Sequence, residues 1–138
     1  MDIQEAVIER INKEIMRLSS IIYDTNLLDD KKKESQDPAY IQFVKTLVEA
    51  ADNFVVYRPS FALYTIIAGY PWFLDWGRDT LIAFEGLLLK LKRFDVAKEV
   101  LLTCIRDMKY GLIPNGYSGY DNRPLYNSAD ASLLLFEQ

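Results

Sequence analysis

The sequence predicts a mainly α-helical fold of antiparallel helical hairpins that contains one small β-hairpin. Two observations carry this prediction. Apolar residues recur at three- and four-residue steps over most of the chain, and two β-prone runs flank the break Arg58-Pro59-Ser60. With 138 residues, 50% of them apolar and 26% charged, the chain is long enough to form one domain with its own core.

The first element is an amphipathic helix predicted over 2–24. The apolar residues with helical spacing in this segment are Ile3, Val7, Ile11, Ile15, Leu18 and Ile22. The spacing holds for only about three heptads, which favours a helix packed on its own domain over a coiled-coil or partner-binding helix. The mixed-charge stretch 29–37 is then a solvated connection, and Asp37-Pro38 begins the next helix.

A second packed helix is predicted over 39–53 from the same spacing. The β-prone runs 54–57 and 61–68 predict a hairpin that leads into the segment 70–79. After it, Asp79 or Thr80 is expected to cap a helix over 81–92. This helix is apolar nearly all round, which predicts an inner helix buried on most sides.

The next helix has a single apolar stripe, as expected of an outer helix that covers one neighbour. We expect Asp95 to cap it, Gly111 to end it, and Cys104 to serve in its stripe as a small buried hydrophobe. Because the connection 92–94 is short, the inner and outer helices are expected to run antiparallel.

A long loop over 112–127, rich in tyrosine and asparagine, precedes a last helix over 131–136 that Ser128 or Asp130 caps. Such a loop suits carbohydrate hydroxyls and rings, although it can also be a simple connector. The order of inner helix, outer helix and a further inner helix is the repeating unit of an α/α barrel.

Composition excludes several classes of function. The net charge of −4 and the pI of 4.8 argue against nucleic acid or an anionic membrane as partner. With no apolar run long enough to cross a bilayer and no leader, the chain is expected to be cytoplasmic. It has no histidine, which excludes Ser-His-Asp and Cys-His catalysis and histidine metal sites, and it lacks phosphate-binding glycine motifs. Carboxylate chemistry without a cofactor or metal is what remains.

The segment 70–79 concentrates the residues that suit a binding pocket. Its aromatic rings can stack on flat sugar or base faces, while Arg78 with Asp75 or Asp79 can form charge-assisted hydrogen bonds to hydroxyls or phosphate. The alternative is an aromatic corner of the core with one buried Arg–Asp pair.

Three stretches of the chain carry a family resemblance. The first is Gly69-Tyr70-Pro71-Trp72-Phe73-Leu74-Asp75-Trp76-Gly77-Arg78-Asp79-Thr80-Leu81-Ile82-Ala83 with Gly86-Leu87-Leu88-Leu89. The others are Gly111-Leu112-Ile113-Pro114-Asn115 and Pro124-Leu125-Tyr126-Asn127-Ser128-Ala129-Asp130-Ala131. In this order they resemble the amylo-α-1,6-glucosidase domain of glycogen debranching enzymes. We therefore expect one domain over 1–138, with 1–36 as N-terminal helix and connection and 37–138 as the family-like part.

The resemblance implies the N-terminal part of a six-hairpin α/α barrel whose parent hydrolyses α-1,6-linked glucose stubs of glycogen or a similar branched α-glucan by inversion. The family's acid and base lie beyond this sequence, so the isolated chain is expected to be inactive. The implied sugar contacts are Arg78 and Asp79, which hold hydroxyls of the terminal glucose, and Trp76, which stacks on the ring or shapes the wall. Further candidates on neighbouring loops are Asp75, Asn115, Tyr126, Asn127 and Asp130.

Several alternatives stay open. Asp130 can bind sugar, cap its helix or serve as a general acid, in that order of preference, and Arg78 and Asp79 can also form a structural ion pair. The chain can instead be a non-catalytic assembly or carbohydrate-binding module, in which a second copy covers its open apolar face. It can also belong to another α/α-barrel glycosidase of the glucoamylase or trehalase kind.

Overall fold

The computed structural model of the protein describes residues 5, 8–9, 12–13, 16, 20 and 38–138. They fall into two compact units, Met1–Ala50 and Ala51–Gln138. The helix predicted over 2–24 lies largely outside the described residues, although those that are described in this segment are helical. The predicted connection over 29–37 lies wholly outside them.

Helix α2 (Pro38–Asp52) confirms the helix predicted over 39–53. It begins at Pro38, where the missing N–H costs nothing because the first amides of a helix have no intrahelical partner. The apolar stripe is only partly used, since Val48 is buried whereas Ile41 and Leu47 are exposed.

Strands β1 (Val55–Arg58) and β2 (Leu63–Ile66) confirm the predicted hairpin. They pair antiparallel in a register that runs from Val55 opposite Ile66 to Arg58 opposite Leu63. The Phe61 N–H donates to the Arg58 carbonyl across the turn at 3.0 Å. The hairpin thus places a buried apolar pair at its base and Arg58 at its tip.

Helix α3 (Gly77–Phe84) continues into the π-helical turn η2 (Glu85–Leu89). The predicted cap at Asp79 or Thr80 is wrong, because the N-cap residue is Trp76, whose carbonyl accepts the Thr80 N–H at 2.8 Å. Asp79 lies in the first turn instead, where the helix dipole favours a carboxylate. The prediction of burial on most sides is also wrong, since Ile82 is 66% exposed.

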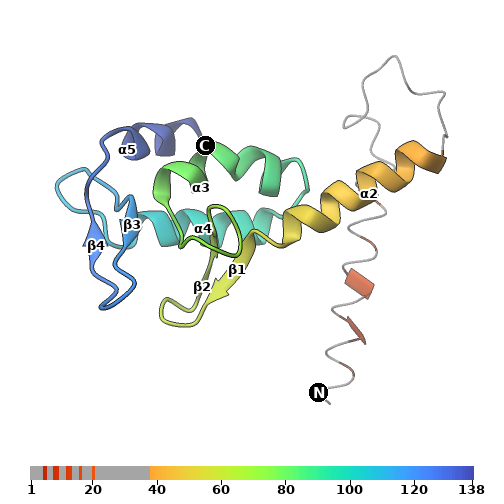
Figure 1. Ribbon diagram of the computed structural model, residues 1–138, viewed down its shortest axis with the longest axis horizontal. Coiled ribbons are helices and arrows are strands. Elements are labelled where there is room, and N and C mark those ends of the chain that lie inside the picture. The colour runs from red at the N-terminus through yellow and green to blue at the C-terminus, as the bar shows by residue number, and fades with distance from the viewer. Residues whose placement is uncertain (1–4, 6–7, 10–11, 14–15, 17–19, 21–37) are drawn as a thin grey trace. The chain divides into compact units, whose positions relative to one another are not determined.

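Helix α4 (Phe94–Ile105) runs back along η2 after the chain reverses direction, as predicted for a helical hairpin (Figure 1). Its N-cap residue is Arg93 rather than Asp95, which lies in the first turn. The helix ends at Ile105 and not at Gly111, which sits with φ +79° in the separate turn that pairs Lys109 with Leu112. The predicted helix is therefore too long at its C-terminal end, because the apolar spacing continues past Ile105.

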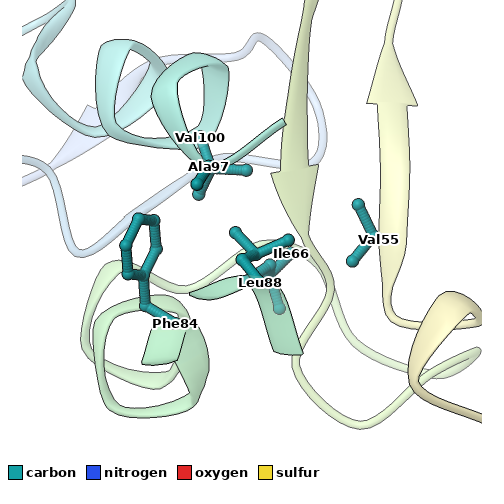
Figure 2. Packing of buried hydrophobic residues seen from close by; sticks show 6 residues of the cluster. All are labelled: Val55, Ile66, Phe84, Leu88, Ala97 and Val100. Atoms are coloured by element: carbon teal, nitrogen blue, oxygen red, sulfur yellow. The ribbon is translucent and has the colours of Figure 1, made fainter. Parts of the chain in front are cut away.

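The core packs β1, β2, α3, η2 and α4 together. Figure 2 shows the cluster from these elements, Val55, Ile66, Phe84, Leu88, Ala97 and Val100. A second cluster of Leu81, Cys104, Ile113 and Ala131 joins α3 and α4 to the following loop and to α5 (Asp130–Leu134). Cys104 is buried, as its place in the stripe predicted.

The predicted loop 112–127 contains a second antiparallel pair, β3 (Gly116–Tyr117) and β4 (Pro124–Leu125). It leads into α5 and the 3-10 turn η3 (Leu135–Glu137). The N-cap residue of α5 is Ala129, so neither predicted cap is the N-cap residue. The first amide past Asp130 still donates to the Asp130 carboxylate at 2.9 Å. The mainly helical class is confirmed, whereas the described residues do not form a closed barrel.

Candidate functional site

The segment Asp75–Gly77 lies as a short strip between the β-hairpin and the loop that follows α4. Asp75 bridges to Ile67, the residue that follows β2, and Trp76 bridges to Gly116 of β3. The Gly77 N–H donates to the Asn115 carbonyl at 2.7 Å. A Cβ at Gly77 would lie 2.6 Å from the Pro114 carbonyl oxygen, so glycine is what lets loop and strip approach this closely.

Arg78, the next residue, forms a two-point ion pair with Asp130 of α5. Its Nε lies 2.7 Å from Asp130 Oδ2, and its Nη2 donates to Asp130 Oδ1 at 3.0 Å. The side chains are 49% and 51% exposed. The structure therefore joins the starts of α3 and α5 through Arg78 and Asp130, rather than through the Arg78–Asp79 pair considered from sequence.

Ser128 forms hydrogen bonds with both members of this pair. Its buried hydroxyl donates to Asp130 Oδ1 and accepts a hydrogen bond from Arg78 Nη2 at 3.4 Å. The hydrogen bond from Ser128, followed by that from Arg78, lowers the pKa of the Asp130 carboxyl below its ordinary value. Sequence reasoning considered Ser128 only as a helix cap, although its place two residues before Asp130 at a helix start was a usable signal.

Asn115 is buried and holds the other side of Arg78. Its Oδ1 accepts the Arg78 backbone N–H at 3.1 Å, and its Nδ2 donates to Asn127 Oδ1 at 3.3 Å. We call these five residues the Arg78 cluster: Arg78, Asn115, Asn127, Ser128 and Asp130. The cluster brings together four of the eight residues predicted as sugar contacts.

Three other predicted contacts lie apart from this cluster. Asp75 is buried in an ion pair with Arg58 and accepts the Thr65 hydroxyl at 3.2 Å. The Tyr126 hydroxyl donates to the Asp107 carbonyl at 2.6 Å. Asp79 is exposed and lines a separate hollow of about 350 Å³ whose other walls are apolar, among them Phe54 and Ile82.

Trp76, which directly follows Asp75 in the chain, is the remaining candidate, and its side chain is partly buried. It packs where Gly116 approaches, with 3.4 Å between its ring and the position of a Cβ on that glycine. Sequence reasoning missed Arg58 altogether, because nothing in its local motif shows that it reaches Asp75 across 17 residues of chain.

Neither a reactive thiol nor a metal centre is found at this site among the residues that the structure describes. Burial, with a smaller contribution from the charge of Asp75, raises the pKa of the Cys104 thiol to about 12. Among the described residues, no group of three or more cysteines and carboxylates is placed to hold a metal ion. In the same part of the chain, no helix combines the length and apolar character needed to cross a membrane.

Comparison with known proteins decides the family. The family described as amylo-alpha-1,6-glucosidase matches residues 49–138. The chain belongs to this family. This confirms the resemblance seen in the three motifs, as against a glucoamylase-like or trehalase-like enzyme.

A glycogen debranching enzyme of Saccharomyces cerevisiae is 46% identical to the chain over 62 residues. The match covers 45% of this chain and 4% of the yeast enzyme, so the chain spans only a small part of that relative. No solved structure matches the chain significantly.

Proposed function

We propose that this chain supplies the part of an amylo-α-1,6-glucosidase domain that binds the terminal glucose of an α-1,6 branch. The observation that carries the proposal is the half-exposed, two-point Arg78–Asp130 pair at the start of two neighbouring helices. Sugar hydroxyls both donate and accept, so a fixed guanidinium beside a fixed carboxylate matches them in two directions.

The chemistry of the cluster suits a neutral, hydroxyl-rich ligand. Asn115 and Asn127 add amide donors and acceptors beside the charged pair, and Trp76 offers a ring against which a sugar face can pack. Glycogen or a limit-dextrin-like branched α-glucan is therefore the proposed ligand. The proposed location is the cytoplasm, as expected from the sequence. The relative's name, glycogen debranching enzyme, supports the same ligand class.

We propose further that the 138-residue chain binds the branch without hydrolysing it. Inverting hydrolysis needs one carboxyl group to protonate the leaving oxygen and a second to activate water. Asp130 is held ionised by Ser128 and Arg78, since both lower its pKa, which disfavours a general acid. Asp75 is occupied by the buried ion pair with Arg58.

The test is calorimetric binding of a maltooligosaccharide with a single α-1,6 glucose stub, with glucose release and a thermal melt measured on the same sample. We expect binding, a cooperative melt and no glucose. Arg78→Ala should abolish binding, whereas Arg123→Ala, which removes an exposed ion pair with Asp121 (2.6 Å), should not. Glucose release in proportion to protein would show that both catalytic carboxylates lie within the chain.

A second candidate, self-assembly, is favoured by one observation. A groove of about 540 Å³ runs between α3, η2 and the C-terminal turns, and it is lined by Leu81, Ile82, Leu89 and Leu134 together with Glu85, Lys90, Glu137 and Gln138. A second copy of the chain is the proposed occupant, because Ile82, which is 66% exposed, and its apolar neighbours in the groove are left uncovered in a single copy, and exposed apolar side chains favour association. Sedimentation equilibrium tests this, and a stable monomer would count against it.

A further inference from the structure

We infer that Arg58 is a positioning residue for the Arg78 cluster: it clamps the strip Asp75–Gly77 to the loop 118–123, so that Arg78 is presented to the ligand. The inference rests on the proposed function for what the cluster binds, but its structural part can be tested without any ligand. Arg58 lies at the tip of the β-hairpin and touches neither Arg78 nor Asp130 in any described contact.

The guanidinium of Arg58 is divided between two segments that are distant in sequence. Its Nη1 pairs with both carboxylate oxygens of Asp75, and its Nη2 donates to Asn122 Oδ1 at 2.8 Å. Thr65 supports Asp75 from β2 through a 3.2 Å hydrogen bond. One side chain therefore ties the strip, the loop and the hairpin together.

Aromatic rings fix the plane of this guanidinium. Its central carbon lies 4.2 Å from the ring centre of Phe61 and 5.0 Å from that of Tyr117, and the two rings meet edge to face at 4.8 Å. The Tyr117 hydroxyl donates to Asp107 Oδ2 at 3.0 Å, which holds the ring. Arg58 thus has one orientation rather than the freedom of a surface arginine.

The route from Arg58 to the cluster is short. Asp75 precedes Arg78 by three residues, and the strip between them is the backbone that Gly116 and Asn115 contact. Arg78 receives its direction from this backbone, because Asn115 Oδ1 accepts its N–H while Asn115 C=O accepts that of Gly77. If Asp75 loses its partner, the strip can shift and the geometry of the Arg78–Asp130 pair with it.

The experiment compares Arg58→Met and Arg58→Lys with the control Arg93→Met in the full chain. Arg93 is similarly buried, with its side chain 15% exposed against 16% for Arg58, and it also forms an ion pair, with Asp52 at 2.8 Å. Two quantities are measured below the melting transition of every variant. These are the NMR signal of the Arg78 Nε–H and the affinity for the stub oligosaccharide.

We expect Arg58→Met to shift the Arg78 Nε–H signal and to weaken binding by about 10-fold or more, with Arg93→Met changing neither. Arg58→Lys should restore part of both, since an ammonium can replace one contact of the planar fork but not all of them. An unchanged Arg78 signal in Arg58→Met, or equal effects of Arg58→Met and Arg93→Met, would overturn the inference.

Asn122→Gly covers the case in which Arg58→Met does not fold. Asn122 has φ +55°, which glycine tolerates, so this variant removes only the contact of Arg58 to the loop. A shifted Arg78 signal supports the clamp, and an unchanged one contradicts it. If the unaltered chain binds no glucan while the Arg78 signal still responds to Arg58, the proposed function fails and the positioning role stands.

Discussion

Two arginine–aspartate pairs of the structure lie in different surroundings, and Asp75 of the first pair precedes Arg78 of the second by three residues. In Arg58–Asp75 the side chains are 16% and 8% exposed, and in Arg78–Asp130 they are 49% and 51% exposed. The first is closed off by rings of Phe61 and Tyr117, whereas the second is open to solvent. Burial, and not residue type, therefore separates a structural pair from one that can meet a ligand.

The difference follows from where each pair sits in the fold. Asp75 lies on the strip between the hairpin and β3, so its partner reaches it through the interior. Asp130 is the first residue of α5, and Arg78 lies in the first turn of α3, so their side chains project from helix starts. Removing one partner is therefore expected to cost more stability in the buried pair, where it leaves an uncompensated charge, than in the exposed pair, whose groups remain accessible to a ligand.

The largest expected effect is on the buried pair. Asp75→Ala leaves Arg58 charged and unpaired inside the protein, so we expect the free energy of unfolding to fall by about 3–5 kcal/mol. Urea denaturation measures it. Replacing both partners, as in Arg58→Met with Asp75→Leu, should recover much of the loss. If Asp75→Ala has the same free energy of unfolding as the unaltered chain, water must reach the pair.

The strip between the two pairs gives the next effect. In Gly77→Ala the new Cβ meets the Pro114 carbonyl oxygen at 2.6 Å, so the loop must move, at a cost of about 1–3 kcal/mol. Gly86→Ala is the control, because a Cβ there meets nothing within 4 Å and alanine favours the helix. Thermal melts of both variants should move in opposite directions, and equal losses would contradict the close approach.

Much of the fold followed from the sequence because its signals are local. The spacing that predicted the helix over 39–53 and the β-prone runs on each side of Pro59 correspond to α2 and to the β1–β2 pair. Helix ends were wrong where a tertiary contact decides them. Gly77 can start α3 because the Asn115 carbonyl, 38 residues later, accepts its N–H, and no local pattern contains that fact.

Local motifs likewise indicated some residues of the candidate site, whereas contacts between distant segments decided the rest. The motif pointed to Arg78, Asn115, Asn127 and Asp130, which the structure brings together. It could not distinguish Asp75 from Asp130, because both are aspartates in family-like stretches and only burial assigns their partners. Arg58 reaches Asp75 across 17 residues of chain, which no local pattern contains, whereas Ser128 could have been found from its place two residues before Asp130.

A smaller effect on stability, with a larger one on binding, is expected at the exposed pair. Asp130→Asn removes the charge while keeping the shape, so the melting temperature should change far less than in Asp75→Ala. Affinity for the stub oligosaccharide should fall by about 10- to 100-fold, because a charged acceptor for sugar hydroxyls is lost. Titration calorimetry beside the melt measures both, and unchanged affinity would remove Asp130 from the binding site.

The smallest and sharpest effect concerns the protonation of Asp130. Its pKa is lowered in the folded chain, first by the Ser128 hydroxyl and then by Arg78. A lowered folded pKa means that the ionised carboxylate stabilises the fold above the ordinary value of about 3.9 and that this contribution is lost as the pH falls through the folded value. Ser128→Ala should raise the pKa of Asp130 toward the ordinary value, so that the ion pair with Arg78 is lost at higher pH.

Carboxyl-carbon NMR over a pH titration measures this shift directly, and Ser118→Ala is its matched control. Ser118 lowers the pKa of Asp121 in the same manner, so its removal should raise the pKa of Asp121 and leave Asp130 unchanged. Each serine would then act on its own aspartate, as expected of a hydrogen bond rather than of the general field of the protein. Asp130 moving equally in both variants would mean that the field, and not the Ser128 hydroxyl, sets the charge of the exposed pair.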